Sequence, residues 1–294
     1  MKKISVGIVI LTLVIGSALA GGQLFVNHQA EIALEERLAE VKDKADVQCD
    51  KVSVNIFTGV ASFQGLKMVT ESSPAPVLVD EVIVHSFRWG QGNPNQQHFE
   101  VIGIKPGANA EAYFPNSPMN VDLAKISWDL ECDYDYNPEH QTLDVNKLRM
   151  AEAQCGVFDM EFHLANLNLP QTPPSSDQMA LLTIKLLFQA KIVGASLTYE
   201  DRALFQLALE KAAREHNKSV DQIRKELGET IKAQMKINQS PALAPILEQV
   251  QAFINNPEKL TIRLSPPEPI GMQAIQAAKT VDEKIRILGL EVKA

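Results

Sequence analysis

The sequence predicts an α+β protein built from an N-terminal membrane anchor, an antiparallel β-meander body and a C-terminal helical module. Three observations carry this prediction. An uninterrupted apolar run opens the chain. Apolar and polar residues then alternate over short segments, as in half-buried strands. In the last third, apolar residues recur at helical spacing between residues that favour helix ends.

The opening run extends from Ile4 to Val26 and follows Lys2 and Lys3. As a helix it measures about 34 Å at ~1.5 Å per residue, enough to span a bilayer. Ala18-Leu19-Ala20 also fits the cleavage pattern of a secretory signal. Residues 1–26 are therefore predicted to be a signal anchor or a signal peptide, and both place the body outside the cytoplasm. An amphipathic helix is expected over residues 27–46.

Residues 47–198 are expected to form the antiparallel β-rich domain. Short alternating segments are separated by turn residues such as Thr58-Gly59 and Asn137-Pro138. Leu181–Leu197 is expected to add one long strand or two short ones. Consecutive hairpins build a meander with one apolar and one polar face. The other expected strands are Val52–Ile56, Val60–Met68, Val82–Trp89, His98–Ile104, Leu123–Tyr136, Leu143–Met150 and Phe158–Leu164.

Residues 199–294 are expected to be a helix-rich module with short strands. Thr198 with Asp201 and Ser219 with Gln222 have the spacing of capping boxes, and Ser240 precedes a proline that can begin a helix. The helices can cover the apolar face of the sheet. They are expected at Arg202–His216, Ser219–Ile237, Pro241–Asn255, Met272–Ala278 and Val281–Ile287, with strands at Leu260–Leu264 and Leu288–Val292.

Charge and motifs exclude several functions. The net charge is −8 with no basic block, which argues against binding nucleic acid. No HExxH, GxSxG or phosphate-binding glycine loop is present. None of the six histidines lies at a metal-ligand spacing from another histidine or a cysteine. The sequence therefore predicts a protein that is not an enzyme, with no catalytic residue, cofactor or metal site.

An acidic segment alternates with apolar residues along one expected strand. The favoured interpretation is a solvated face of acids, and the alternative is a weak Ca²⁺ site that relieves their repulsion. Pro138 stands where an EF-hand loop requires glycine, which excludes that motif. The acids are Asp129, Glu131, Asp133 and Asp135.

Other residues are given structural interpretations. Cys49, Cys132 and Cys155 are expected to be free, buried thiols, with a Cys132–Cys155 disulfide as the alternative. Trp89 and Trp128 are expected to anchor the core. The charged residues of Tyr199-Glu200-Asp201-Arg202 are expected to lie at a helix N-terminus.

The strongest apolar pattern is a candidate ligand-binding face. Phe158, Met160, Phe162 and Leu164 all fall on one side of a single expected strand. Such a face cannot stand open in water, so helices, another copy of the chain or lipid must cover it. The alternative is that these side chains are sealed in a core.

The segment KVSVNIFTGVASFQGLKM, which follows the anchor and its helix, resembles the start of AsmA-like bacterial envelope proteins and their shorter uncharacterised relatives. Thr58-Gly59 and Gly65-Leu66-Lys67 match the pattern. LDVNKLRMAEAQCGVFDMEFHLANLNL resembles the repetitive β segments of the same group, so the resemblance covers residues 4–70 and 120–170. It implies a periplasmic β-rich body tethered to the inner membrane, with a role in envelope or lipid homeostasis. It supplies no catalytic residues.

Together these observations predict a non-enzymatic, single-pass membrane-tethered periplasmic protein that binds lipid or another apolar ligand. Its partners are then the inner membrane, through the N-terminal helix, and lipid or an envelope protein. The alternatives are a structural scaffold that recruits an envelope partner and, less favoured, an exported hydrolase.

Overall fold

A computed structural model describes residues 45–55, 58–70, 73–85, 95–105, 126–169, 186, 188–238 and 240–294. The chain divides into two compact units. Unit 1 comprises Met1–Asp133 and Met150–Ala153, and unit 2 comprises Tyr134–Arg149 and Gln154–Ala294. The predicted anchor at residues 1–26 lies outside the described residues. Within the described part, no helix is both long and apolar enough to cross a membrane.

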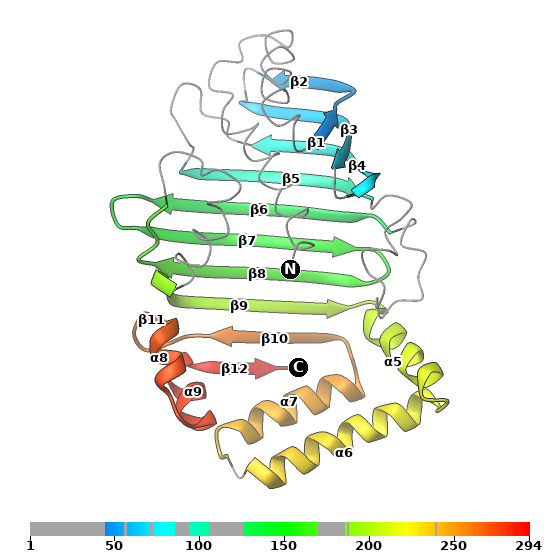
Figure 1. The fold of residues 1–294 in the computed structure, drawn as a ribbon, viewed down its shortest axis with the longest axis vertical. Coiled ribbons are helices and arrows are strands. Elements are labelled where there is room, and N and C mark those ends of the chain that lie inside the picture. Colours follow the sequence, from blue (N-terminus) through cyan, green and yellow to red (C-terminus); the bar gives the residue numbers. More distant parts are fainter. Residues whose placement is uncertain are drawn as a thin grey trace. The chain divides into compact units, whose positions relative to one another are not determined.

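Unit 1 is an antiparallel sheet (Figure 1). Strand β3 pairs with both β1 and β2, and β4 and β5 follow in sequence order. This confirms the first two predicted hairpins. The beginning of the expected helix at 27–46 is not described, and its last two residues belong to β1. The strands are β1 (Ala45–Gln48), β2 (Lys51–Asn55), β3 (Val60–Thr70), β4 (Ser73–His85) and β5 (Gln96–Ile104).

Strand β4 begins at Ser73, well before the predicted start at Val82. Pro74 and Pro76 explain the error, because proline donates no ladder hydrogen bond and normally argues against a strand. At this end the pairing with β3 is irregular, with a register shift between Met68 and Thr70.

The core of unit 1 is the apolar face of this sheet. The register places Phe63 opposite Val82 and Val82 opposite Val101, so these side chains share one side. Val82 is 1% exposed, and Val84 and Phe99 are 1% and 2% exposed. The predicted alternation thus buries these apolar side chains of β4 and β5, whereas Leu78, earlier in β4, is 41% exposed.

The third predicted hairpin is formed by β6 (Trp128–Asn137) and β7 (Thr142–Glu152), which are neighbours in the sheet and contribute residues to both units. Its turn follows Asn137, whose side-chain oxygen accepts hydrogen bonds from the backbone N–H groups of Glu139 and His140, both at 3.0 Å. This is the local bonding that makes asparagine a turn residue.

The strands of unit 2 are also antiparallel. Strand β8 (Gly156–Ala165) pairs with β9 (Lys191–Asp201), β9 pairs with β10 (Lys259–Leu264), and β10 pairs with β12 (Leu290–Lys293). The two-residue β11 (Ile270–Gly271) also pairs with β9. The predicted domain boundary at residue 198 falls inside β9.

The strand predicted over Leu181–Leu197 is shorter than expected at its beginning. Leu186, Phe188 and Gln189 are helical, and the backbone N–H of Ala190 donates to the Leu186 carbonyl at 2.8 Å. A continuous apolar run does not distinguish a strand from a short helical segment, which explains the difference.

All five predicted C-terminal helices are present: α5 (Leu204–Glu215), α6 (Val220–Asn238), α7 (Leu243–Asn255), α8 (Met272–Ala277) and α9 (Val281–Leu288). The capping box before α6 is confirmed. Ser219 N donates to Gln222 Oε1 at 2.9 Å, and Gln222 N donates to Ser219 Oγ at 3.2 Å. Ser240 caps α7 by accepting from Leu243 N at 3.0 Å.

The capping box predicted before α5 is wrong. Thr198 lies within β9, and its hydroxyl contacts the Thr261 hydroxyl on β10 at 3.1 Å. The N-cap residue is Ala203, which forms no side-chain cap, and the Asp201 carboxylate instead accepts from the Phe205 N–H in the first turn at 2.9 Å. The expected placement of acidic charge at this helix N-terminus is therefore confirmed for Asp201.

The helices of unit 2 surround the last strands more than they cover them (Figure 1). Helix α5 lies at one end of β10 and β12, α8 and α9 lie at the other end, and α6 and α7 lie beyond the edge formed by β12. Helix α7 contacts both β10 and β12. The expectation that the helices lie over the sheet is thus only partly met.

Candidate functional site

The predicted apolar face on β8 continues across three further strands of unit 2. Phe158, Met160 and Phe162 pair directly with Tyr199, Leu197 and Ala195 of β9. Directly opposite residues point to the same side of a sheet. We call the following set the apolar face: Phe158, Met160, Phe162 and Leu164 on β8; Ile192, Ala195, Leu197 and Tyr199 on β9; Leu260, Ile262 and Leu264 on β10; and Leu290 and Val292 on β12.

The opposite side of these strands is polar. On β8 it carries Asp159, whose carboxylate accepts from Arg149 at 3.1 Å, and His163, whose ring lies 2.8 Å from Asp144. The neighbouring positions on β9 are Ser196 and Thr198. The sheet of unit 2 is therefore amphipathic, with its charged pairs away from the apolar face.

Every side chain of the apolar face is half-buried, and none is fully buried. Burying a large apolar side chain stabilises a protein by about 1.5–3 kcal/mol. Each of these side chains still exposes some apolar surface. Covering that surface would therefore stabilise the protein further.

One end of the apolar face is closed by aromatic packing. The Phe158 and Tyr199 rings stack with centroids 4.5 Å apart, and Phe253 of α7 meets Tyr199 edge-on at 6.0 Å. Phe205 of α5 completes the group, 5.4 Å from Phe253. Phe253 is only 6% exposed, so these four rings join the sheet to its helices.

The Tyr199 hydroxyl forms hydrogen bonds at this closed end of the apolar face. It donates to the backbone carbonyl of Cys155 at 3.2 Å and contacts the carboxylate of Asp201. Burial, with the adjacent Asp201 carboxylate, raises the pKa of Tyr199 above its usual range. This phenol therefore stays protonated and acts as a structural donor.

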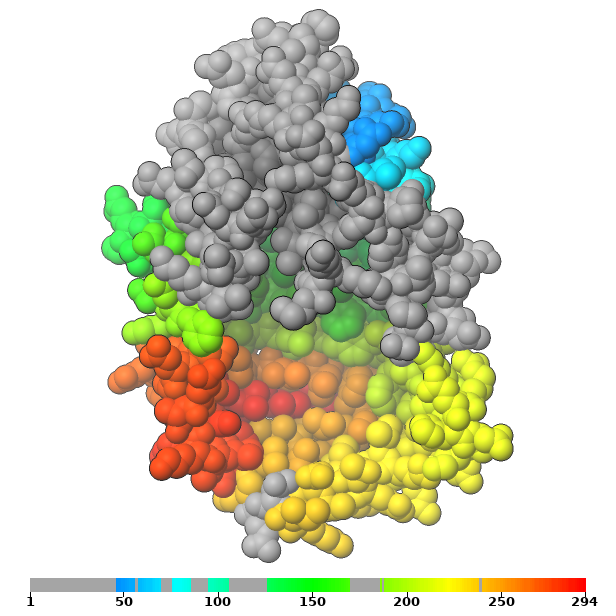
Figure 2. Space-filling model, in the orientation of Figure 1, coloured from blue at the N-terminus to red at the C-terminus, as the bar shows by residue number. Residues whose placement is uncertain are grey.

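Strands β10 and β12, which carry part of the apolar face, lie where the surface of unit 2 is recessed (Figure 2). Figure 2 shows β10 and β12 recessed between α8 and α9 on one side and α5 on the other, with α7 below them. A concave surface with aliphatic and aromatic lining is the usual form of a site for an apolar ligand.

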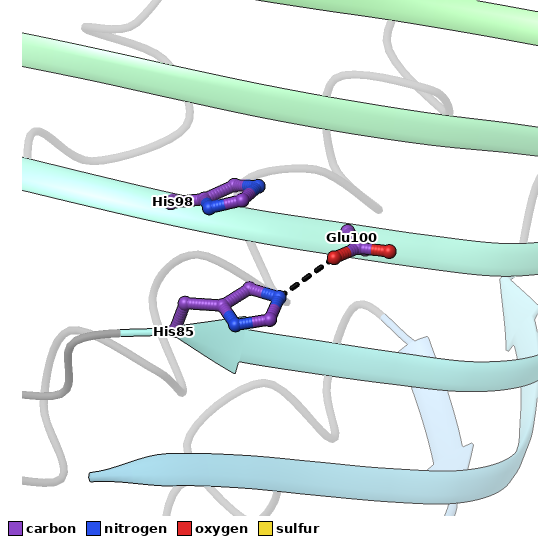
Figure 3. A group of neighbouring side chains, drawn as sticks. All are labelled: His85, His98 and Glu100. Carbon is purple, nitrogen blue, oxygen red and sulfur yellow. Dashed lines mark hydrogen bonds and ion pairs between the residues drawn. The ribbon is translucent and has the colours of Figure 1, made fainter. Parts of the chain in front are cut away.

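Unit 1 holds a second cluster, which sequence spacing did not reveal. The register of β4 and β5 places His85 directly opposite His98. Their rings stack with centroids 4.4 Å apart, and His85 Nε2 lies 2.7 Å from Glu100 Oε1 (Figure 3). The three possible ligand atoms lie within 4.8 Å of one another. The spacing of the histidines along the sequence gave no sign of this contact, because it depends on the register of two strands.

The acidic residues of β6 extend this cluster. Glu131 Oε1 lies 3.3 Å from His98 Nε2, an ion-pair distance, but the two atoms do not form a hydrogen bond. Asp129 accepts a hydrogen bond from Gly103 N at 2.9 Å. Two of the four predicted acids thus meet partners on β5, which relieves part of their mutual repulsion.

The three cysteines and Trp128 can be placed in the described structure. None of the three cysteines forms a disulfide. Cys155 is fully buried, whereas Cys49 and Cys132 are half-buried, so the predicted burial is confirmed for Cys155 alone. Burial, with the nearby charge of Asp133, raises the pKa of the Cys132 thiol to about 11. Trp128 is half-buried and Trp89 lies outside the described residues.

Comparison with known proteins adds one finding about the second half of the chain. A family model described only as "Uncharacterized protein" matches residues 149–294. No curated protein is similar to the chain. The matched segment includes strands β8 to β12 and helices α5 to α9, which together form the apolar face and its surroundings.

Proposed function

We propose that this protein is a membrane-tethered protein of the bacterial envelope that binds the acyl chain of a lipid on the apolar face of unit 2. The observation that carries the proposal is the half-buried state of a face that continues over β8, β9, β10 and β12. The apolar N-terminal run supports the location, because a bilayer anchor would hold this face near its ligand.

The energetics suit an acyl chain. Each methylene removed from water contributes about 0.8 kcal/mol. About ten buried methylenes would contribute roughly 8 kcal/mol, before the cost of ordering the chain is subtracted. A ligand bound on the apolar face would also bury the exposed parts of side chains such as Ile262 and Val292, which are half-buried in the protein alone.

We propose binding rather than catalysis because the face offers no general acid or base. Its residues are aliphatic or aromatic, and its one hydroxyl, on Tyr199, is held by Cys155 and Asp201. His163 lies on the polar side of β8 and contacts Asp144.

Binding of cis-parinaric acid, a fluorescent fatty acid, to the full-length protein in detergent tests the proposal. We expect Phe162→Asp to weaken binding about tenfold, because an acyl chain bound on the apolar face would have to strip water from the new carboxylate. The melting temperature should change by only a few degrees, since Phe162 is half-buried. Native mass spectrometry should show co-purified lipid on the wild type and less on this variant.

Ser196→Asp is the matched control. Ser196 lies one residue from Leu197 but on the polar side of β9, opposite Arg263. It should bind the probe as the wild type does. If Phe162→Asp does not fold, the face is a sealed core, and if it folds and binds normally, the ligand lies elsewhere; both results contradict the proposal.

The membrane tether requires its own test. The full-length protein should fractionate with membranes and resist a high-salt wash. A mature protein whose N-terminus is Gly21 would show instead that the opening run is a cleaved signal.

A further inference from the structure

We propose that His85, His98 and Glu100 bind a divalent transition-metal ion, with Zn²⁺ the best fit, on the polar side of unit 1. These residues offer two imidazole nitrogens and a carboxylate oxygen within 4.8 Å of one another. Imidazole with carboxylate is a ligand set that favours Zn²⁺ over Ca²⁺ or Mg²⁺, which take oxygen ligands.

The strands hold the three residues in place. His85 and His98 form a direct cross-strand pair of β4 and β5, and Glu100 lies two residues beyond His98 on the same side. Zn²⁺ bonds to nitrogen and oxygen of roughly 2.0–2.2 Å require ligand atoms about 3.4 Å apart in a tetrahedral site. The three atoms lie within 4.8 Å of one another, so binding of an ion would draw the side chains closer together.

One nitrogen of the cluster lacks a hydrogen bond. The Nε2 atom of His98 is buried and forms none with any group in the described structure. A buried nitrogen in this state is costly, and coordination to a metal would satisfy it. Glu131 Oε1 lies 3.3 Å from the same nitrogen and would place a further negative charge beside the ion.

The other histidine is already oriented toward its carboxylate. His85 Nε2 lies 2.7 Å from Glu100 Oε1, so an ion between them would replace the shared proton (Figure 3). Glu100 and Glu131 together carry two negative charges, which would balance the charge of the ion.

The structure offers a comparison within the same chain. His163 of β8 lies 2.8 Å from Asp144, and the two side chains are each 45% exposed. This is a histidine–carboxylate pair without a second histidine, so it should not bind a metal tightly. His163→Ala is therefore a control that removes one histidine without touching the proposed site.

Calorimetric titration of the chelator-treated full-length protein with ZnCl₂ tests the site, using an affinity tag free of histidine. We expect one Zn²⁺ per chain. His85→Ala/His98→Ala should lower the affinity more than about tenfold, and His163→Ala should not change it. Glu100→Gln should lower it less, because a neutral amide is a weaker ligand than a carboxylate.

Co²⁺ provides a readout that does not depend on any variant. Bound to the wild type, it should show the intense visible absorption of a tetrahedral site, and added Zn²⁺ should abolish it. Absence of stoichiometric Zn²⁺ binding to the wild type would overturn the proposal. Unchanged affinity in a folded His85→Ala/His98→Ala variant would do the same, and His98→Gln replaces that variant if it does not fold.

Discussion

Unit 1 and unit 2 both contain an antiparallel sheet with one apolar side, yet the two apolar sides are buried to different extents. In unit 1, Val82, Val84 and Phe99 are at most 2% exposed. In unit 2, Phe158, Met160 and Phe162 are all half-buried. The same alternation of residues therefore produces a sealed core in one unit and an accessible surface in the other.

The polar sides differ as well. In unit 2, charged residues form separate pairs, such as Lys259 with Glu200 at 2.9 Å. In unit 1, His85, His98 and Glu100 gather at one place. Unit 1 thus combines buried apolar side chains with a cluster of possible metal ligands. Unit 2 combines half-buried apolar side chains with separate ion pairs. The difference suggests separate roles for the two units.

The largest effect is expected from placing a charge in each apolar face. Val82→Asp would bury an unpaired carboxylate in unit 1, which costs several kcal/mol and should prevent folding of that unit. Phe162→Asp in unit 2 should leave a cooperative unfolding transition. Chemical denaturation with circular dichroism measures both. Equal loss of stability would remove the distinction between the two faces.

A large effect is also expected where the helices close unit 2. Phe253→Ala removes the ring that contacts both Tyr199 and Phe205, and replacing a buried phenylalanine with alanine costs about 3–5 kcal/mol. Ile237→Ala is the control, because that side chain is 73% exposed on α6. A cost below about 1 kcal/mol for Phe253→Ala would mean that the aromatic group does not join helices to sheet.

A smaller effect is expected at the junction of α7 and α9. Ser240 Oγ accepts from Leu243 N at 3.0 Å and donates to Asp282 Oδ1 at 2.6 Å, and the residue is 8% exposed. Ser240→Ala should cost about 1–2 kcal/mol, because it removes a helix cap and a partner of Asp282. Thermal unfolding measures the change, and Ser219→Ala, at an exposed cap, should cost less.

The smallest effect concerns pH on the polar side of unit 1. Hydrogen bonds from Ser62, and then from Gln64, hold the pKa of Glu81 below its ordinary value of 4.5. The stability this contributes is therefore complete above the unfolded pKa and is lost as pH falls through the lowered folded pKa. Ser62→Ala should raise the Glu81 pKa in a carbon-detected NMR titration. Ser53→Ala, one strand away, should leave it unchanged.

The elements of the fold follow closely from local sequence. Period-two alternation located the hairpins, and helical spacing with caps such as Ser219 and Ser240 located α6 and α7. These patterns involve only a few neighbouring residues, so they can be recognised in the amino-acid sequence alone. The errors occurred where a local signal was ambiguous, at the prolines of β4 and at the apolar run that precedes β9.

The candidate sites depended much more on tertiary structure. Four residues of the apolar face were predicted from β8, because they alternate within one strand. Their partners on β9, β10 and β12 come from strands far apart in sequence, and only pairing brings them together. His85 and His98 are likewise joined by register, since no spacing rule links two histidines on adjacent strands.

The sequence by itself determined which side of each strand is apolar, where the helices begin and end, and that a large net negative charge accompanies a body without known catalytic motifs. Tertiary structure decided which strands pair, how much of each apolar side is covered, and which carboxylates meet which histidines. The physical reason is the separation along the sequence of the residues that interact. Side-chain alternation and capping are set by neighbouring residues, whereas register and burial depend on contacts between distant segments.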